Sequence, residues 1–157
     1  MRRRTALLAT VVSAAGIGAG AALASTGAAQ APGPPTGTKE VVLRQSSFKF
    51  LDHPPRRRGD VPPSPGDASI LGYLIFDAAG KKRLGRMDVM CTSTDRRGKR
   101  LLCTGAMHLP DGHIELAGTG DPLAITGGTG AYAGARGIAD GTSSSGRDEH
   151  VTLTFMP

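Results

Sequence analysis

Beyond residue 38 the chain shows no apolar periodicity of a helix sustained over two turns, and this absence restricts its fold most. Short runs rich in β-branched and aromatic residues alternate instead with segments of Gly, Pro, Asp and Ser, a pattern typical of strands joined by turns. The predicted strands are 40–50, 68–76, 82–94, 99–109, 113–119, 123–126, 135–142 and 149–155. Eight antiparallel strands in hairpin order close a small up-and-down barrel, whose interior holds side chains or one small ligand. We therefore predict an all-β, eight-stranded antiparallel β-barrel, with a two-sheet sandwich as the alternative.

The N-terminus has the composition of a secretory signal peptide. Arginines at positions 2–4 precede an apolar run of Ala and Gly without acidic residues, and Ala22 and Ala24 form a small-residue cleavage pattern. A membrane anchor is the alternative, but the glycines and alanines make this run weakly hydrophobic. We predict a signal peptide at residues 1–24, no stable membrane span after its removal, and a secreted or extracytoplasmic protein exported by the Sec or the twin-arginine route.

The remaining chain is long enough for one domain. Residues 25–38 are rich in Ala, Pro, Gly and Thr and are predicted to form a flexible linker, and residues 39–157 form the barrel domain. Of the 19 basic residues, the leader carries three, which leaves 16 against 13 acidic residues and a net charge of +3. The high isoelectric point of the whole chain therefore comes partly from the leader.

A proline-rich segment interrupts the strand pattern between residues 52 and 67. Five prolines surround the three arginines at positions 56–58, so this stretch cannot be a central strand and is predicted to be a surface loop over one end of the barrel. The arginines could meet an anionic partner. No aromatic residue is interleaved for base stacking, however, and the block is short, so we predict a solvated run and no nucleic-acid binding.

The two cysteines are predicted to face each other across a hairpin. If Arg96, Arg97 and Gly98 form a three-residue loop with Gly98 in the left-handed conformation, Cys91 lies opposite Cys103. Neighbours in a non-hydrogen-bonded cross-strand pair approach closely enough for a disulfide, which persists in an exported protein. Two buried free thiols are the alternative. The spacing lacks the paired pattern of a metal site, so no metal is predicted.

A second hairpin indicates a candidate acid–base pair. A two-residue turn at Asp111 and Gly112 would place His108 opposite Glu115. Such a pair could relay a proton, or it could form a surface salt bridge, because both positions lie near the hairpin tip.

Asp88 is a third candidate, and its role depends on which face of its strand points inward. If Asp88 faces the lumen, a carboxylate there needs a partner and is a functional candidate. If it faces solvent, it is an ordinary polar position, and Met87, Val89 and Cys91 form the core. The odd-numbered face is the more apolar.

The stretch from residue 125 to residue 137 is dense in glycine but matches neither a phosphate-binding loop nor a dinucleotide-binding turn. Its glycines are predicted to provide positive φ angles and close backbone approach at a sharp corner between two strands, with Tyr132 covering the corner. The glycines concerned are Gly127, Gly128, Gly130 and Gly134.

This stretch resembles the Gly-Gly-Thr-Gly-x-(Tyr/Phe)-x-x-Ala-Arg-Gly block of the dirigent and allene oxide cyclase superfamily of small β-barrels. Leu84-Gly85-Arg86 resembles a further segment of dirigent proteins, and Asp52-His53 resembles their His-Asp segment with the order reversed. The resemblance implies a barrel that shapes a reactive intermediate in an apolar lumen: dirigent members guide phenoxy-radical coupling or close a quinone methide, and the cyclases close a cyclopentenone ring. Arg136 matches the arginine of the block, either as a functional group or as an anchor of the corner.

The function predicted is therefore a secreted dirigent or allene oxide cyclase-like barrel that binds a small hydrophobic molecule. If it is an enzyme, a cofactor-independent isomerase or cyclase guiding an intramolecular ring closure fits best. Asp88, Glu115 and Arg136 are the candidate catalytic residues, and Tyr73 and Tyr132 are the candidate ligand contacts. A non-catalytic secreted carrier or cell-envelope binding protein is the alternative. No cofactor is predicted, and apolar residues on both faces of the second strand leave a homo-oligomer open.

Overall fold

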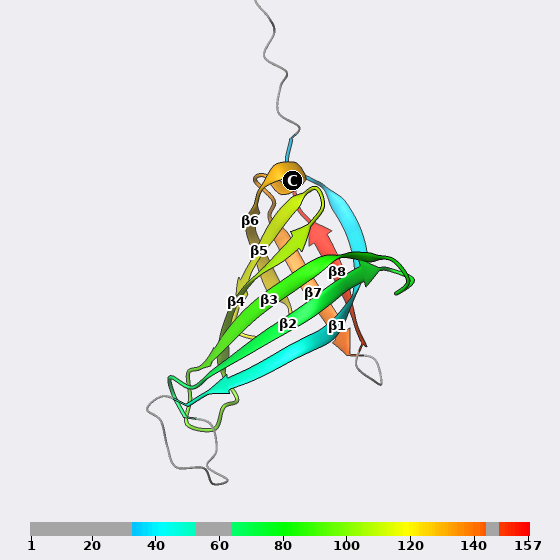
Figure 1. Ribbon diagram of the computed structural model, residues 1–157. Coiled ribbons are helices and arrows are strands. Elements are labelled where there is room, and N and C mark those ends of the chain that lie inside the picture. Colours follow the sequence, from blue (N-terminus) through cyan, green and yellow to red (C-terminus); the bar gives the residue numbers. More distant parts are fainter. Residues whose placement is uncertain (1–32, 53–63, 144–147) are drawn as a thin grey trace, which may run out of the picture. The chain divides into compact units, whose positions relative to one another are not determined.

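The computed structural model describes residues 33–52, 64–143 and 148–157. They form a closed antiparallel barrel in the strand order β1-β2-β3-β4-β5-β6-β7-β8 (Figure 1), which confirms the predicted fold class. The strands are β1 Gly37–Leu51, β2 Ala68–Asp77, β3 Arg83–Ser93, β4 Leu101–Leu109, β5 Gly112–Gly118, β6 Leu123–Gly128, β7 Gly137–Ser143 and β8 Asp148–Phe155, with a short 3-10 helix η1 at Gly130–Tyr132. All eight agree with their predicted bounds within three residues. The predicted signal peptide and most of the proline-rich loop lie outside the described residues.

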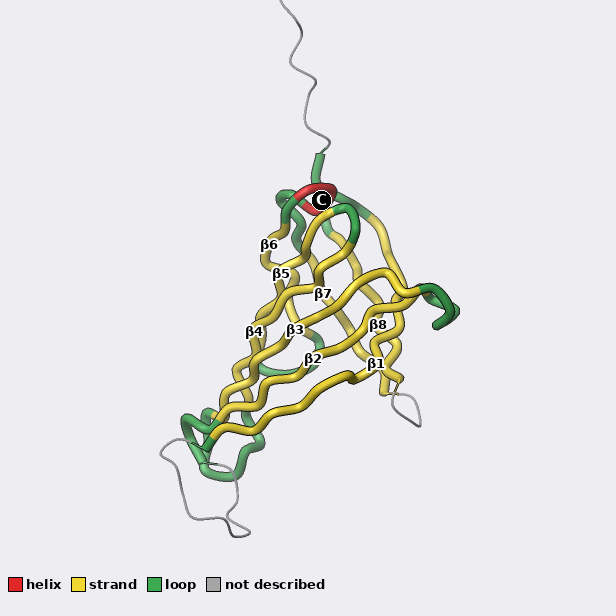
Figure 2. The backbone as a smooth tube through the Cα atoms, viewed as in Figure 1, coloured by secondary structure: helices red, strands yellow, loops and turns green. Residues whose placement is uncertain are grey.

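Pairing between the first and last strands closes the barrel. β1 runs beside β8 from Gly37, opposite Phe155, to Arg44, opposite Asp148 (Figure 2). A register shift in the pairing with β2 then falls between Gln45 and Ser47, and the rest of β1 pairs with β2 alone. β1 therefore starts in the closed part of the barrel and ends beyond its pairing with β8.

Alternation of inward and outward side chains builds most of the core, although the consecutive residues Val41, Val42 and Leu43 of β1 are all buried. In β3 the side chains of Met87, Val89 and Cys91 are buried, whereas Asp88 and Met90 between them are exposed. Burial of a large aliphatic side chain stabilises the fold by about 1.5–3 kcal/mol. The largest apolar side chains that are almost completely buried are those of Val41, Leu43, Ile75, Met107, Ile114 and Leu153.

The hairpin between β3 and β4 has the predicted register. Gly98 adopts a φ of 62°, Cys91 pairs with Cys103, and their sulfurs form a disulfide. The predicted disulfide is therefore confirmed, and both of its cysteines belong to the inward face.

The predicted register of the next hairpin is wrong. His108 lies opposite His113, and Glu115 lies opposite Ala106. The turn consists of residues 110 and 111, because Gly112 already belongs to the ladder. Gly112 has a φ of 143°, and a side chain there would collide with the backbone of Thr129, so both its conformation and the close packing of the corner require glycine.

The glycine-rich stretch forms the corner between β6 and β7. Gly130 and Gly134 have φ angles of 61° and 73°, as predicted, whereas Gly127 and Gly128 do not adopt positive φ. Gly128 is needed for space, because a Cβ there would lie 2.6 Å from the carbonyl oxygen of Tyr132. The Ala131 amide donates a 2.8 Å hydrogen bond to the carbonyl of Asp111, which ties the corner to the neighbouring hairpin.

Candidate functional site

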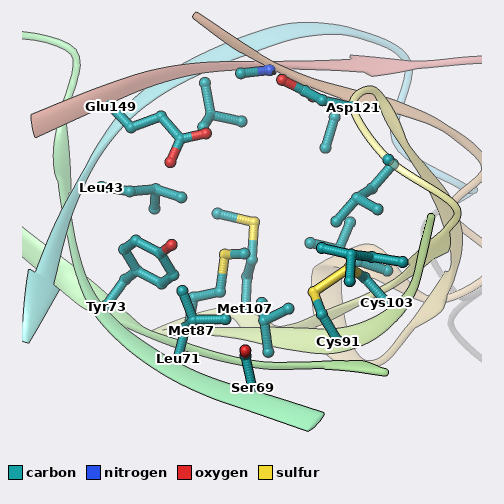
Figure 3. Close-up of a pocket in the computed structure, with 18 of the residues that line it drawn as sticks. Leu43, Ser69, Leu71, Tyr73, Met87, Cys91, Cys103, Met107, Asp121 and Glu149 are labelled. Atoms are coloured by element: carbon teal, nitrogen blue, oxygen red, sulfur yellow. Dashed lines mark hydrogen bonds between the residues drawn. A yellow bond between two sulfur atoms is a disulfide. The ribbon is translucent and has the colours of Figure 1, made fainter. Parts of the chain in front are cut away.

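The barrel contains a cavity of about 330 Å³ (Figure 3). Most of its wall is aliphatic or sulfur-containing, because the inward positions of β1 to β4 carry Leu, Val, Met and Cys. Met87, Met107 and the Cys91–Cys103 disulfide contribute the sulfur atoms of the wall. The interior is thus not completely filled by its own side chains, and a small apolar molecule fits its chemistry.

A few polar side chains face this apolar wall. Tyr73 comes from β2, Glu149 from the start of β8, and Asp121 from the loop between β5 and β6. Figure 3 shows the Glu149 carboxylate and the Tyr73 hydroxyl directed into the same space. Glu149 is partly buried and Asp121 is exposed, so the two carboxylates mark an end of the cavity that solvent reaches.

Gly141 of β7 allows the two carboxylates to converge. Its amide donates a 3.1 Å hydrogen bond to Asp121 Oδ1. A Cβ at this position would lie 3.2 Å from Asp121 Oδ2 and would collide with Glu149 Oε1. Any larger residue at position 141 would therefore displace the Glu149 carboxylate.

The surroundings of Glu149 favour its protonated form. Burial raises the pKa of Glu149, and the negative charge of Asp121 raises it further. Burial also raises the pKa of Tyr73, with a contribution from the charge of Glu149. A carboxyl group with a raised pKa can both release and accept a proton closer to neutral pH than an ordinary glutamate.

Asp148, which precedes Glu149 on β8, has its pKa shifted in the opposite direction. Asp148 accepts hydrogen bonds of 2.8 Å from both Nε and Nη2 of Arg44, and these bonds lower the pKa of Asp148. Neighbouring carboxyl groups on opposite faces of one strand are therefore shifted in opposite directions.

Of the two tyrosines predicted to contact a ligand, only Tyr73 lines the cavity. Tyr132 lies in η1, where it is buried and stacks on Phe155 with 6.1 Å between ring centroids. Its hydroxyl accepts a 2.7 Å hydrogen bond from Lys39 Nζ. Tyr132 thus covers the glycine-rich corner, as expected from the sequence, and does not belong to the cavity wall.

The three candidate catalytic residues lie away from the cavity. Asp88 points outward, 3.5 Å from Arg86 Nε and 3.9 Å from His108 Nε2, because Met87 and Val89 occupy the inward positions of its strand. The lumen placement considered for Asp88 is therefore wrong.

Glu115 is also on the outer face, 3.5 Å from His113 Nε2. Arg136 donates hydrogen bonds to the carbonyl oxygens of Thr126 and Ala135, which are the contacts expected of a corner anchor.

Sequence reasoning missed both carboxylates of the cavity. Glu149 has the same parity as Val151, Leu153 and Phe155, which are all buried, and this alternation is the signal that could have placed it inward. Asp121 carries no comparable signal, because it lies in a loop without periodicity.

Metal-ligating side chains do not gather in the part of the chain that the structure describes: no three His, Cys, Asp or Glu residues there could hold a metal ion together. Within the same residues no helix is long and apolar enough to cross a membrane.

No protein-family profile and no curated protein sequence matches this chain. Several solved structures, in contrast, are similar to this chain. Pyocyanin demethylase is similar with a TM-score of 0.64 and 23% identity over 76% of this chain and 99% of its own. Two pterocarpan synthase dirigent proteins each have a TM-score of 0.56, one at 18% identity over 75% of this chain and 84% of its own, the other at 16% over 76% and 95%. At these identities the likeness establishes the fold: the chain has the barrel fold of dirigent proteins, as its glycine-rich block indicated.

Proposed function

We propose that this protein is a secreted barrel that binds a small hydrophobic molecule in its lumen and promotes a proton-transfer isomerisation or ring closure on it without a cofactor. The observation that carries the proposal is the partly buried Glu149 carboxyl group, which shares an apolar cavity with the hydroxyl of Tyr73. The similar structures supply a precedent, since their names describe a demethylase of pyocyanin and synthases of pterocarpans.

The cavity suits such chemistry in size and composition. Ligand sites are mostly apolar clefts of about 300–1,000 Å³ with a few converging polar groups. The cavity falls in the lower part of that range, at about 330 Å³, with Tyr73 and Glu149 as its converging groups. A closely fitting wall restricts a flexible molecule to few conformers, which favours an intramolecular reaction.

The two polar side chains have complementary roles in this proposal. Ionised Glu149 removes a proton from the ligand, and its raised pKa makes the carboxylate a stronger base than an exposed glutamate. The hydroxyl of Tyr73, whose raised pKa keeps it protonated, donates a hydrogen bond to the oxygen on which negative charge develops. Protonated Glu149 then returns the proton to another atom of the same ligand, so that no other reactant is consumed.

Secretion is part of the proposal and rests on two observations. The composition of residues 1–24 is that of an export signal, and the Cys91–Cys103 disulfide suits an oxidising compartment.

Ring opening of 5-nitrobenzisoxazole tests the base directly, because it requires only a carboxylate in an apolar site. The base removes the ring C–H proton, the N–O bond breaks, and a coloured nitrile-bearing nitrophenolate forms. We expect Glu149→Gln to lower the protein-dependent rate about tenfold, below the 10²–10⁴-fold of an optimised acid–base group. The wild-type rate should rise with pH as Glu149 ionises, with a midpoint above the usual glutamate range.

Asp140→Asn is the matched control, since Asp140 lies on β7 beside the cavity residues Ala139 and Gly141 but is exposed. This variant removes the same charge outside the cavity and should react like the wild type. Equal rates for Glu149→Gln and the wild type would refute the acid–base role and leave the non-catalytic carrier as the function of the cavity.

A further inference from the structure

The charged side chains that line the described part of the cavity are all acidic. Its described lining residues include the carboxylates of Asp121 and Glu149 but no Lys, Arg or His. Tyr73 and Ser69 are neutral. The described wall of the cavity therefore presents carboxylates and hydroxyl groups to a ligand.

The described cations nearest to Glu149 in sequence and pairing contact other groups or lie on the outer face. Arg44 forms a two-point ion pair with Asp148, and Lys39 donates to the hydroxyl of Tyr132. His150 follows Glu149 on β8 but is exposed on the other face.

Among the residues that the structure describes, the neighbours that face Glu149 include no cation. They come from four elements: Leu43 of β1 and Ser143 of β7 as its pairing partners, Tyr73 of β2, Gly141 of β7, and Asp121 of the loop between β5 and β6. No described basic group near Glu149 is thus in position to neutralise the pair of carboxylates.

The rest of the wall favours an aromatic body. The sulfurs of Met87 and Met107 line the cavity, and polarisable sulfur makes favourable contacts with aromatic rings. Phe48 of β1 also lines the cavity, with 59% of its surface exposed, and can stack on a ring that enters from solvent.

We propose that the lumen selects aromatic molecules that carry a protonated amine at one end, with the ring against the sulfur-rich wall and the ammonium group between Glu149 and Asp121, and that it rejects the corresponding carboxylates. This inference rests on the proposed binding function. An ammonium group donates hydrogen bonds to both carboxylates, whereas an anion in the same place meets like charge without a neutralising partner.

The selection also couples to pH. An ammonium group bound beside Glu149 stabilises the ionised carboxylate, so binding below the pKa of Glu149 releases a proton. The affinity for the amine therefore rises as the pH rises through that pKa, and the affinity for a neutral alcohol of the same shape does not.

Three naphthalene derivatives of nearly equal shape test the charge preference: 2-naphthylmethylamine, 2-naphthalenemethanol and 2-naphthoate. Each is titrated against the protein at neutral pH in competition with N-phenyl-1-naphthylamine, a neutral dye that fluoresces in apolar sites. A partly exposed charge pair changes affinity by up to a few-fold, and in opposite directions for the two ions. We therefore expect the amine to bind about tenfold more tightly than the carboxylate, with the alcohol between them.

Variants locate the preference within the cavity. Glu149→Gln and Asp121→Asn should each reduce the ratio of amine to carboxylate affinity by a factor of about three, whereas Asp140→Asn on the outer face should leave it unchanged. Dye binding together with equal amine and carboxylate affinities would overturn this inference and leave the proposed function in place. If neither the dye nor any of the three naphthalenes binds, the proposed function falls and the inference falls with it.

Discussion

Replacing Gly130 by Val is expected to remove a large part of the stability of the barrel. Gly130 has a φ of 61°, which a β-branched residue adopts only with strain, and a Cβ there would collide with the carbonyl oxygen of Asp111. The backbone strain costs about 1–3 kcal/mol. The steric overlap adds about 1–3 kcal/mol. The sum is a large fraction of the free energy of unfolding of a typical domain, and chemical denaturation followed by circular dichroism measures it.

Two matched variants separate these contributions. Gly80→Val introduces the strain alone, because Gly80 has a φ of 68° with no atom within 4 Å of a new Cβ. Gly128→Val introduces the overlap alone, since the φ of Gly128 is not positive but its Cβ would lie 2.6 Å from the Tyr132 carbonyl oxygen. Gly130→Val should lower the free energy of unfolding more than either. If it costs no more than Gly80→Val, the packing of the corner against the neighbouring hairpin does not stabilise the fold as described.

Removing the disulfide should have the second large effect. Cys91 and Cys103 are separated by 12 residues, and closing a loop of this length restricts the unfolded chain by about 3 kcal/mol. Replacing both cysteines by Ala avoids leaving a single reactive thiol and should lower the free energy of unfolding by about 2–4 kcal/mol, measured by denaturation without reductant.

Measuring stability with and without a reductant is the control for the variant in which both cysteines are replaced by Ala. The wild type under strong reductant should lose stability, whereas the variant with both cysteines replaced should not respond. A variant within about 1 kcal/mol of the oxidised wild type would show that the bridge constrains the unfolded chain little.

The strands were predictable because inward and outward side chains alternate along much of several of them and turn residues separate them. An alternating pattern fixes the type of element and its inward face together, as in β3, where Met87, Val89 and Cys91 alternate with exposed residues. The corner was predictable because its glycines are dense and specific in spacing, although only Gly130 and Gly134 of the four have positive φ.

The register of a hairpin was predictable only where the residues of its turn allowed a single turn type. Gly98 adopts the left-handed conformation of its loop, and the disulfide follows from that register. Gly112 follows an Asp in a pattern typical of a two-residue turn, yet it belongs to the ladder, where its φ of 143° and the backbone of Thr129 packed on it both require glycine. Sequence cannot distinguish a glycine of the turn from such a glycine of the ladder, since the contact partner lies in another hairpin.

The site was the least predictable part. Candidate carboxylates were sought in the middle of one strand and near a hairpin tip, whereas Glu149 is the second residue of β8 and Asp121 lies in a loop. The parity of β8 could have placed Glu149 inward. Its closeness to Asp121 depends on the closure of the barrel around Gly141, which is a property of the three-dimensional arrangement.

Binding of N-phenyl-1-naphthylamine to a variant with a filled cavity tests the central claim most directly. Ala139 is buried in the cavity wall, and Ala139→Phe places a ring in the lumen; Ala124→Phe adds the same ring at an exposed position of the neighbouring strand β6. We predict saturable dye fluorescence for the wild type and for Ala124→Phe, and at least about tenfold weaker binding for Ala139→Phe when circular dichroism shows it folded. Equal affinity in all three proteins would place the dye outside the barrel and contradict a ligand-binding lumen.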